Sequence, residues 1–521
     1  MQPEMAFYKL RKGIRREWIL CIVSVFVFGL LAHSFKFTNF IPNWDSVLNL
    51  NTDQNKINLG RCFLQAACSL GSYYDLPWIN GLLSLLYISL SAVCVSEVFQ
   101  IRKTIPLVLL GGLMVTFPTV TSTFAYQYTA DGYFLALLCV SGATLLAVRG
   151  GKMAILPSAA LLAFSLGIYQ TYITFAMVLM LLFLVDQLLF QQMSIRSFWK
   201  TAGKFAATGV LGAAGYMICM KVMTALEGIG LSHYQGIESA YSMESLNLMA
   251  AVKRALYRFL IYFLNFSEGI NLSVLLNMIL WVLLAVLLVA ALVKQQLWKE
   301  PARILLILLC IGLLPLASFA LYFATPDLDY HNLMRMCLCL IYMIPLIFYE
   351  RMEKLLPAAL QMKQWSILVL TSLVIYNFIL LANISYQKMH MAYEKSYGVA
   401  IRIADRIEQT PGATDCRKIA VLGHLPGSQA ISVNFPLDMT GITDSYIIRK
   451  QDPEMQENVL QIFLQDYTGL SFEDTTLEEI QRIQQSEEYR QMGCWPEQNG
   501  ILVMGDTLVI RFAEDQAYVQ Q

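Results

Sequence analysis

The stretch from residue 41 to residue 61 holds residue types that could carry out chemistry at a membrane surface. It places Asp45 directly after Trp44 and adds Asp53 and Arg61 further along. A carboxylate within reach of a hydroxyl can act as a general base, and a guanidinium binds phosphate through paired hydrogen bonds. A polar loop of about forty residues is also long for a simple connection between two apolar segments. The alternative is a solvated loop in which Asp45 caps a short helix.

The composition is that of a polytopic membrane protein. Of the 521 residues, 57% are hydrophobic and 14% are charged, whereas soluble proteins carry about 25% charged residues. The formal net charge is zero, which argues against a role in binding nucleic acid. The eleven cysteines form no CxxC pair and no Cys/His cluster, so we expect no metal and no cofactor. Cys416 and Cys494 follow the last apolar segment, and either a disulfide or two free thiols is expected there.

Apolar segments and their basic flanks predict about eleven transmembrane helices. The first follows a basic N-terminus, so we place the N-terminus in the cytoplasm and the loop with Asp45 outside. Basic clusters at the short loops then all fall on the inner side. Within the long outer segment 227–271, residues 246–266 have the spacing of an amphipathic interfacial helix, or of a further span. The predicted spans are 18–33, 78–99, 105–124, 132–148, 154–168, 172–190, 205–226, 272–293, 304–323, one beginning at Arg335, and 365–384.

The composition changes near residue 385, where apolar runs shorten and charge rises. We therefore divide the chain into a transmembrane domain, 1–385, and an extracytoplasmic α+β domain, 386–521. Residues 501–504 and 507–512 are predicted strands joined by Gly505-Asp506, which is typical of a hairpin. The other predicted elements of this domain are a strand at 418–422 and helices at 395–409, 454–465 and 477–491.

The predicted outer loops concentrate ionisable and aromatic side chains at one interface, while the spans carry almost no charge. Ion-coupled transporters usually have carboxylates or broken helices near the midplane, so this pattern favours an enzyme with a substrate partly in lipid and partly in water. For at least half of the tyrosines, a plain interfacial belt is the alternative. The candidate catalytic residues are Asp45, Asp53 and Asp131, and the candidate binding residues are Trp44, Arg61, Tyr128, Tyr133, Arg254, Arg258, Asp327, Asp329, His331 and Arg335.

Glycosyl transfer from a lipid phosphate matches these residue types. A polyprenyl tail would lie between helices, and its phosphate would need cations at the headgroup level, such as Arg61, Arg335 or the basic residues near Arg254. The phosphate is a charge-stabilised leaving group, so the chemistry demands no metal, and an outer carboxylate would take the proton of the acceptor hydroxyl. The sequence contains no DxD-type nucleotide-sugar site with a soluble Rossmann domain on the inner side.

Several stretches resemble a known family: NWDSVLNL…GR in the first outer loop, then WINGLLSLLYISL, YTADGYFLALL, SLGIYQTY and the C-terminal MGCWPEQNGILVMGDTLVIRF. They are similar to the GtrII-like bacterial glucosyltransferases that modify O-antigen and other surface polysaccharides. The resemblance implies a GT-C-type membrane fold, polyprenyl-phosphate-glucose as donor and a surface glycan as acceptor. A sugar-lipid synthase and a flippase would act upstream.

In the GT-C class the catalytic carboxylate lies in the first extracytoplasmic loop. The matching position is Asp45, Asp53 is the second candidate, and Asp131 would contact donor or acceptor in the next outer loop. The tandem acidic pair of some relatives is missing from the first loop, which leaves the identity of the base open.

Two functions without chemistry are the alternatives. A lipid-linked-saccharide flippase or transporter would be expected to line a central cavity with charge through the membrane depth, and an anchor for the C-terminal domain would need only one span. We therefore expect a membrane hexosyltransferase of the bacterial plasma membrane that acts at its outer face.

Overall fold

The computed structural model describes residues 4–5, 13–50, 52–232, 248–266, 271–325, 328–351, 361–423 and 459–512, without the side chains of Trp44, residues 361–363 and Val459. These residues form two compact units. The first unit contains the described parts of Met1–Asn39 and Thr52–Asn383, and the second contains those of Phe40–Asn51 and of the chain from Ile384 onward. The helix-forming stretch Trp44–Asn49 therefore belongs to the second unit, although it lies early in the sequence.

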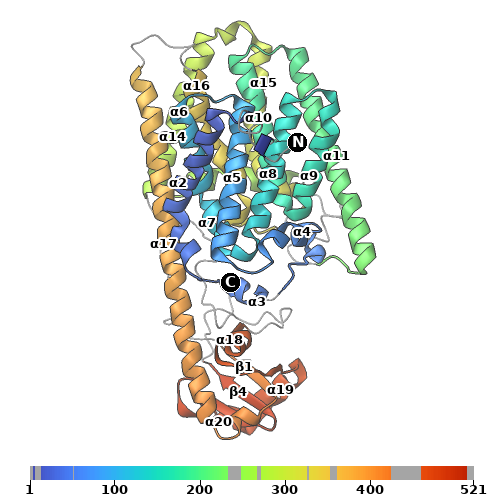
Figure 1. Ribbon diagram of the computed structural model, residues 1–521, viewed down its shortest axis with the longest axis vertical. Coiled ribbons are helices and arrows are strands. Elements are labelled where there is room, and N and C mark those ends of the chain that lie inside the picture. The colour runs from blue at the N-terminus through green and yellow to red at the C-terminus, as the bar shows by residue number, and fades with distance from the viewer. Residues whose placement is uncertain are drawn as a thin grey trace. The chain divides into compact units, whose positions relative to one another are not determined.

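The first unit is a bundle of apolar helices (Figure 1). Among the described residues, nine helices are long and apolar enough to cross a membrane. They are α2 (Arg16–Thr38), α5 (Pro77–Phe99), α6 with α7 (Thr104–Thr116 and Pro118–Ala125), α8 (Gln127–Arg149), η4 with α10 (Gln170–Tyr172 and Ile173–Phe190), α11 (Ile195–Glu227), α14 (Leu272–Lys294), α15 (Pro301–Ser318) and α17 (Gln361–Gln409). The prediction of a multi-pass helical protein is confirmed.

Two further predicted segments correspond to shorter helices. The apolar stretch Lys152–Ile168, made of η3 (Lys152–Ala154) and α9 (Ile155–Ile168), is shorter than the nine long helices. The segment predicted to begin at Arg335 starts with two short 3-10 turns, η8 (Asn332–Met334) and η9 (Met336–Leu338), and continues as α16 (Cys339–Arg351). Residues 352–360, which follow it, lie outside the described part of the chain.

Proline explains where the third long segment bends. Phe117 has φ −55° and ψ 137°, the extended conformation that a residue before proline prefers. Pro118 then opens α7 at a position where its missing N–H costs nothing. Pro77 opens α5 in the same way.

Small residues let the central helices approach closely. A Cβ added to Gly81 of α5 would lie 2.6 Å from the ring of Phe37 in α2, and one added to Gly29 of α2 would lie 2.5 Å from Leu85 of α5. Such close van der Waals packing drives helix association in lipid. As a result α5 packs along both α2 and α8, and α9 packs against α8 and α11 (Figure 1).

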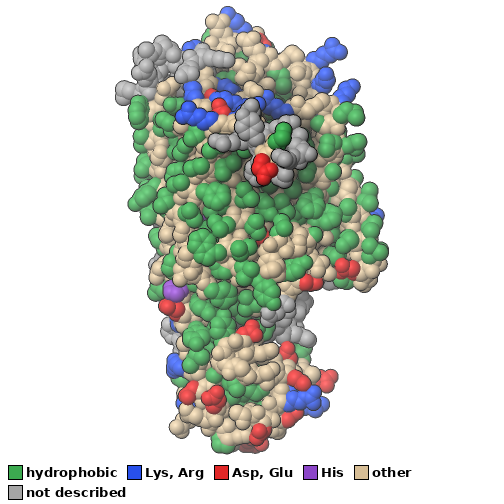
Figure 2. All heavy atoms as spheres, viewed as in Figure 1, with side chains coloured by type: hydrophobic (Ala, Val, Ile, Leu, Met, Phe, Trp, Pro, Cys, Tyr) green, Lys and Arg blue, Asp and Glu red, His purple; other side chains and the backbone are tan. Residues whose placement is uncertain are grey.

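The two ends of the helical unit differ in chemistry. At the end where α5 finishes and α6 begins, here called the basic end, Lys and Arg side chains gather above a hydrophobic belt (Figure 2). The opposite end, here called the loop end, carries the short elements between α2 and α5. They are η1 (Ile57–Leu59), α4 (Leu64–Cys68) and η2 (Ser69–Gly71), and η7 (Ala320–Phe323) follows α15 at the same end. The candidate residues of the first unit have to be sought at the loop end.

The helix expected within residues 246–266 is α13 (Leu248–Phe263), and it has one buried face. The buried residues recur every four positions: Ala251, Ala255, Phe259 and Phe263. Arg254 and Arg258 are exposed away from that face. The buried face packs against α15 and η7.

The second unit contains a four-stranded sheet in the order β2-β1-β4-β3. The strands are β1 (Lys418–Leu422), β2 (Glu473–Asp474), β3 (Ile501–Met504) and β4 (Thr507–Arg511). The predicted hairpin is confirmed, because β3 and β4 pair antiparallel and Met504 lies opposite Thr507 across the Gly505-Asp506 turn. Strand β1 pairs in parallel with both β2 and β4, so this unit is an α+β structure as expected.

Helices of the second unit pack around this sheet. Its main core combines the C-terminal part of α17 with α3 (Trp44–Asn49) and α18 (Val459–Thr468), through residues such as Val47 and Phe463. The predicted helix 477–491 is divided at Ser486 into α19 (Leu477–Gln485) and α20 (Glu487–Gln491), since the Ser486 hydroxyl accepts from the N–H of Tyr489 and caps the second helix. Cys416 and Cys494 are both free thiols.

Candidate functional site

The segment that carries Arg61 is tied to the helices around it. Gly60 has φ +74°, a left-handed conformation that favours glycine, and it closes the short turn before Arg61. The carbonyl of Gly60 accepts hydrogen bonds from Gln170 Nε2 at 2.8 Å and from the Tyr216 hydroxyl at 2.8 Å. The N–H of Phe63 donates to the carbonyl of Gly167 at 2.8 Å. Arg61 is thus held against α9, η4 and α11.

The side chain of Arg61 lies on a pair of stacked tyrosines. Its Nη1 donates to the hydroxyl of Tyr133 at 2.8 Å. Its Cζ is 5.1 Å from the ring centre of Tyr169 and 5.7 Å from that of Tyr133. The two rings are stacked, with centroids 4.4 Å apart and an angle of 10° between their planes. A half-buried guanidinium oriented in this way is suited to bind phosphate, because it is weakly hydrated and presents several donors in a fixed plane.

A second arginine of the loop end is Arg335, which follows the turn after α15. Its Nη2 donates to the carbonyl of Tyr330 at 2.6 Å, and its Nη1 donates to Asn332 Oδ1 at 2.7 Å. Its Cζ lies 6.0 Å from the ring centre of Tyr262 in α13. Burial raises the pKa of Tyr330 well above its ordinary value, and the nearby phenol of Tyr169 adds to the effect. Arg335 is thus held by the turn after α15 and by the ring of Tyr262.

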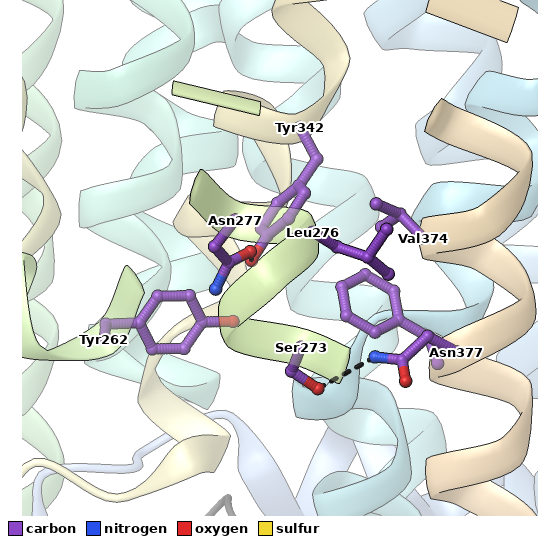
Figure 3. A pocket seen from close by; sticks show the side chains of 8 residues that line it. Tyr262, Ser273, Leu276, Asn277, Tyr342, Val374 and Asn377 are labelled. Carbon is purple, nitrogen blue, oxygen red and sulfur yellow. Dashed lines mark hydrogen bonds between the residues drawn. The ribbon is translucent and has the colours of Figure 1, made fainter. Parts of the chain in front are cut away.

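A small pocket opens beside Tyr262 (Figure 3). Its walls come from α13, α14, α16 and α17, and it has room only for a water-sized group. The hydroxyl of Tyr342 donates to Asn277 Oδ1 at 2.8 Å, and Asn377 Nδ2 donates to Ser273 Oγ at 2.9 Å. The lining residues are Tyr262, Ser273, Leu276, Asn277, Tyr342, Val374, Asn377 and Phe378. Amide and phenol groups therefore line a pocket beside Tyr262, the ring on which the guanidinium of Arg335 lies.

Asp131 is buried near the start of α8, with 1% of its surface exposed. Neither carboxylate oxygen accepts a hydrogen bond from the described residues. A Cβ added to Gly71 would lie 2.6 Å from Asp131 Oδ2 and 2.8 Å from Asn80 Oδ1, so both oxygens face the same point. The sequence analysis placed Asp131 in an outer loop. The structure corrects this, because its carboxylate is buried within the protein.

The two aspartates of the first loop lie in different units. Asp45 belongs to α3 in the second unit, is half-buried, and accepts from Asn49 Nδ2 at 2.9 Å. The helix is capped by Asn43, whose Oδ1 accepts from the N–H of Ser46 at 2.7 Å, so Asp45 is not the capping residue. Asp53 belongs to the first unit and is exposed. Its oxygens accept from the N–H of Asn55 at 3.0 Å and from Gln65 Nε2 at 2.7 Å, and both contacts brace the loop.

The remaining candidates are dispersed. Tyr128 is buried in the first turn of α8, and Arg254 and Arg258 project from the exposed side of α13. His331 Nδ1 lies 3.6 Å from Asp329 Oδ2, and the side chain of Asp329 is exposed. Asp327 and the side chain of Trp44 lie outside the described part of the structure. The structure thus brings together Arg61 and Tyr133, and it adds Tyr169, which is not among the binding residues predicted from the sequence.

Two buried charges at the loop end were missed by the sequence reading. Lys36, near the end of α2, and Asp75, just before α5, are both buried and lie close enough to interact electrostatically. Asn80 and Gln127, which flank Asp131, were also missed. A lysine or an amide at the end of an apolar segment is the signal that could have identified them, because a polar side chain there is costly to bury unless it serves a purpose.

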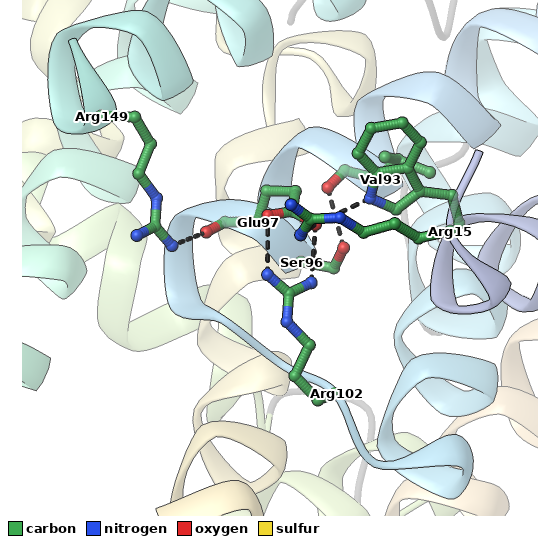
Figure 4. Close-up of polar contacts among 7 residues, drawn as sticks. Arg15, Val93, Ser96, Glu97, Arg102 and Arg149 are labelled. Carbon is green, nitrogen blue, oxygen red and sulfur yellow. Dashed lines mark hydrogen bonds and ion pairs between the residues drawn. The ribbon is translucent and has the colours of Figure 1, made fainter. Parts of the chain in front are cut away.

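Several charged residues of the basic end contact one another (Figure 4). Glu97 accepts from Arg102 at 2.6 and 2.8 Å, from Trp18 Nε1 at 2.7 Å and from Arg15 at 3.4 Å. Nearby, Arg351 donates to both oxygens of Asp186 at 2.9 and 3.0 Å. These pairs join the ends of four helices, α2, α5, α10 and α16, so we interpret this end as structural. Among the described residues, no three His, Cys, Asp or Glu side chains gather as a metal site.

A family profile described as glucosyl transferase GtrII matches residues 34–349. This range includes Arg61, Asp131, Tyr169 and Arg335 and ends within α16. No curated protein and no solved structure matches the chain significantly.

Proposed function

Because the chain belongs to the glucosyl transferase GtrII family, we propose that it transfers glucose from a polyprenyl phosphate to a surface glycan at the outer face of the bacterial plasma membrane. The family indicates a glucosyltransferase, and the long apolar helices indicate a multi-pass membrane protein. The donor, the acceptor, the membrane face and the roles of individual residues are our inference from the chemistry of the loop end.

Charge distribution supports the assignment of the loop end to the outer face. Lys and Arg side chains gather at the basic end (Figure 2), and positively charged ends of membrane helices stay in the cytoplasm. The end with Arg61 then faces outward. Nucleotide sugars are cytoplasmic, so an outward-facing transferase needs a donor that is carried across in lipid, and a polyprenyl-phosphate sugar has this property.

The contact of Arg61 with Tyr133 and Tyr169 is the observation that carries the proposal. Phosphate at the membrane surface needs a cation whose direction is fixed, and a guanidinium gives paired hydrogen bonds as well as charge. The Tyr133 hydroxyl orients Arg61, and the aromatic faces limit its hydration. Arg335, beside the neighbouring Tyr330, is the proposed second cation for the same phosphate.

In the proposed reaction the acceptor hydroxyl oxygen attacks the anomeric carbon of the bound glucose. The bond between that carbon and the phosphate oxygen breaks, and its electron pair leaves with the polyprenyl phosphate. Arg61 and Arg335 stabilise the charge of the departing phosphate, which is the largest kind of contribution that fixed donors make to such reactions. The hydroxyl proton passes to a carboxylate.

Asp45 is the proposed base, as the resemblance to GT-C enzymes implies. Its carboxylate is half-buried and accepts from Asn49 Nδ2 at 2.9 Å. Asp53 is the weaker candidate, since both of its oxygens already hold the loop. Asp131 is 1% exposed, and this burial favours a supporting role over direct contact with a sugar.

A comparison of donors tests this function. The purified protein is incorporated into lipid vesicles and given a surface glycan with either polyprenyl-phosphate-glucose or a nucleotide-linked glucose, each radiolabelled in the sugar. We expect label in the glycan only from the lipid donor, and empty vesicles serve as the control. Transfer from the nucleotide sugar alone would contradict the proposed donor class.

A further inference from the structure

The oxygen atoms around Gly71 form an unusual buried group at the junction of η2, α5 and α8. Asp131, Asn80 and Gln127 are each at most 1% exposed. Four of their side-chain oxygens accept no hydrogen bond from the described residues: Oδ1 and Oδ2 of Asp131, Oδ1 of Asn80 and Oε1 of Gln127. Buried acceptors without donors are rare, and each costs free energy unless some group satisfies it.

The orientation of the two amides is fixed by their other hydrogen bonds. Asn80 Nδ2 donates to the carbonyl oxygens of Tyr74 and Gln127, both at 2.9 Å. Gln127 Nε2 donates to the carbonyl oxygen of Pro77 at 3.2 Å. Exchanging oxygen and nitrogen in either amide would place an acceptor against these carbonyls. The atom of each amide that has no hydrogen-bond partner among the described residues is therefore the oxygen. An amide oxygen can only accept hydrogen bonds.

The three side chains that carry these oxygens are neighbours, since Asn80 Nδ2 also bonds to the main chain of Gln127. Gln127 and Asp131 are four residues apart on α8, so their side chains are neighbours on one face of the helix. Oδ2 of Asp131 and Oδ1 of Asn80 lie 2.6 and 2.8 Å from the point where a Cβ of residue 71 would be. Glycine at position 71 lets η2 approach these two oxygens more closely than a residue with a Cβ could. No positive φ is recorded for Gly71, so its backbone would tolerate alanine and the space is what demands glycine.

The number and charge of the oxygens indicate what satisfies them. A proton on Asp131 would satisfy one further acceptor, and a single water has only two hydrogens for four oxygens. A cation can be coordinated by all four, since carboxylate and amide oxygens are the ligands that hard cations prefer. The group carries one negative charge, so a monovalent cation leaves the buried site neutral, whereas a divalent one would leave a buried net charge.

We propose that Asp131, Asn80 and Gln127 form a binding site for a monovalent alkali cation, of the sodium type, above Gly71. The cation joins η2 to the first turns of α5 and α8. It stabilises the short segment that also contains Arg61. This site is separate from the proposed transfer chemistry, so it can be tested without an activity assay.

Binding of radioactive sodium to the purified full-length protein tests the proposal, with unlabelled sodium, potassium and choline as competitors. The wild type is expected to bind one labelled ion that choline does not displace, and to unfold at a higher temperature in sodium chloride than in choline chloride at equal ionic strength. Asp131→Asn removes the charge at constant size, and Gly71→Ala places a methyl group 2.6 Å from Asp131 Oδ2 and 2.8 Å from Asn80 Oδ1, which displaces ligand oxygens without removing one. Each should weaken sodium binding about ten- to hundred-fold, as expected when a charged buried contact is lost.

Asp53→Asn is the matched control, because Asp53 is an exposed carboxylate of the same end, and it should bind sodium like the wild type. If Asp131→Asn does not fold, Gly71→Ala still decides the question. Equal unfolding temperatures in sodium and choline with no bound label would overturn the proposal. An infrared band of a protonated carboxylic acid that disappears in Asp131→Asn would overturn it as well, since a proton would then occupy the site.

Discussion

The guanidinium of Arg61 donates a 2.8 Å hydrogen bond to the phenolic oxygen of Tyr133, a residue 72 positions further along the chain. The contact connects the segment before α4 to the first turns of α8, next to the ring of Tyr169. It fixes the direction of a positive charge at the loop end of the helical unit. This is the arrangement that a membrane-bound phosphate would require.

Replacement of Arg61 should weaken donor binding. Arg61→Ala removes a charged hydrogen bond to phosphate, which costs about 1.5–3 kcal/mol, or roughly ten- to hundred-fold in affinity. Arg61→Lys should recover only part of this loss, because the paired donors of the guanidinium are gone. The donor KM of each variant is the measurement, with Lys221→Ala, an exposed cation of α11, as control. A wild-type KM for Arg61→Ala would reduce this residue to an interfacial anchor.

Arg335 should affect both donor binding and stability. Arg335→Ala removes the donors to the Tyr330 carbonyl and to Asn332, so we expect a raised donor KM together with a lower unfolding temperature. Asn332→Ala removes one of these contacts and leaves the charge in place. It is therefore the matched control. If Asn332→Ala raises the donor KM as much as Arg335→Ala, then Arg335 acts only by holding the turn.

The base is identified by comparing two aspartates of the first loop. Asp45→Asn keeps the volume but cannot take a proton, and general-base catalysis contributes about 10²–10⁴-fold. We therefore expect kcat to fall by about a hundred-fold or more, with donor binding unchanged. Asp45→Glu should retain some activity, and Asp53→Asn should be much milder. The reverse order of the two Asn variants would move the role to Asp53, and near wild-type turnover of the double variant would exclude both.

Membrane sidedness can be measured with single cysteines that react from outside intact cells. Serine resembles cysteine in size, but Ser46 and Ser396 would be poor positions for the label because they are only 0% and 5% exposed. Leu70, 64% exposed at the loop end, and Glu394, whose side chain is 64% exposed, are better ones. In a background without native thiols, Leu70→Cys and Glu394→Cys should react with an impermeant reagent, and Met153→Cys, at an 89% exposed position of the basic end, should not. Labelling of Met153→Cys alone would show that the basic end faces outward, which is the opposite of the assigned topology.

Much of the fold could be predicted from local signals in the sequence. The β3–β4 hairpin follows from Gly505-Asp506 between two short apolar runs, because glycine readily adopts the φ of +66° found there. The amphipathic spacing identified α13. The prediction that residues 365–384 and 395–409 are separate helices was incomplete, because α17 is continuous from Gln361 to Gln409. The intervening residues contain no proline or glycine that would interrupt it.

The site was less predictable, because its contacts join residues far apart in the sequence. Residue type suggested that Arg61 and Tyr133 matter, but only packing of α4 against α8 and of η1 against α11 brings them together. The burial of Asp131 and the surrounding amides depends on the same packing. The assignment of α3 to the second unit rests on Val47, which is buried beside Phe463, more than 400 positions later in the chain. No periodicity within one segment encodes such a contact.

The central claim is that the chain breaks the bond between a hexose and a lipid phosphate. The most direct test follows both products in the same vesicles, with the donor labelled in the sugar and in the phosphate. We predict that one polyprenyl phosphate is released for every glucose that becomes attached to the glycan, and that Asp45→Asn and Arg61→Ala slow both products equally. Movement of the intact donor across the membrane, with neither product formed, would contradict the account and indicate a flippase.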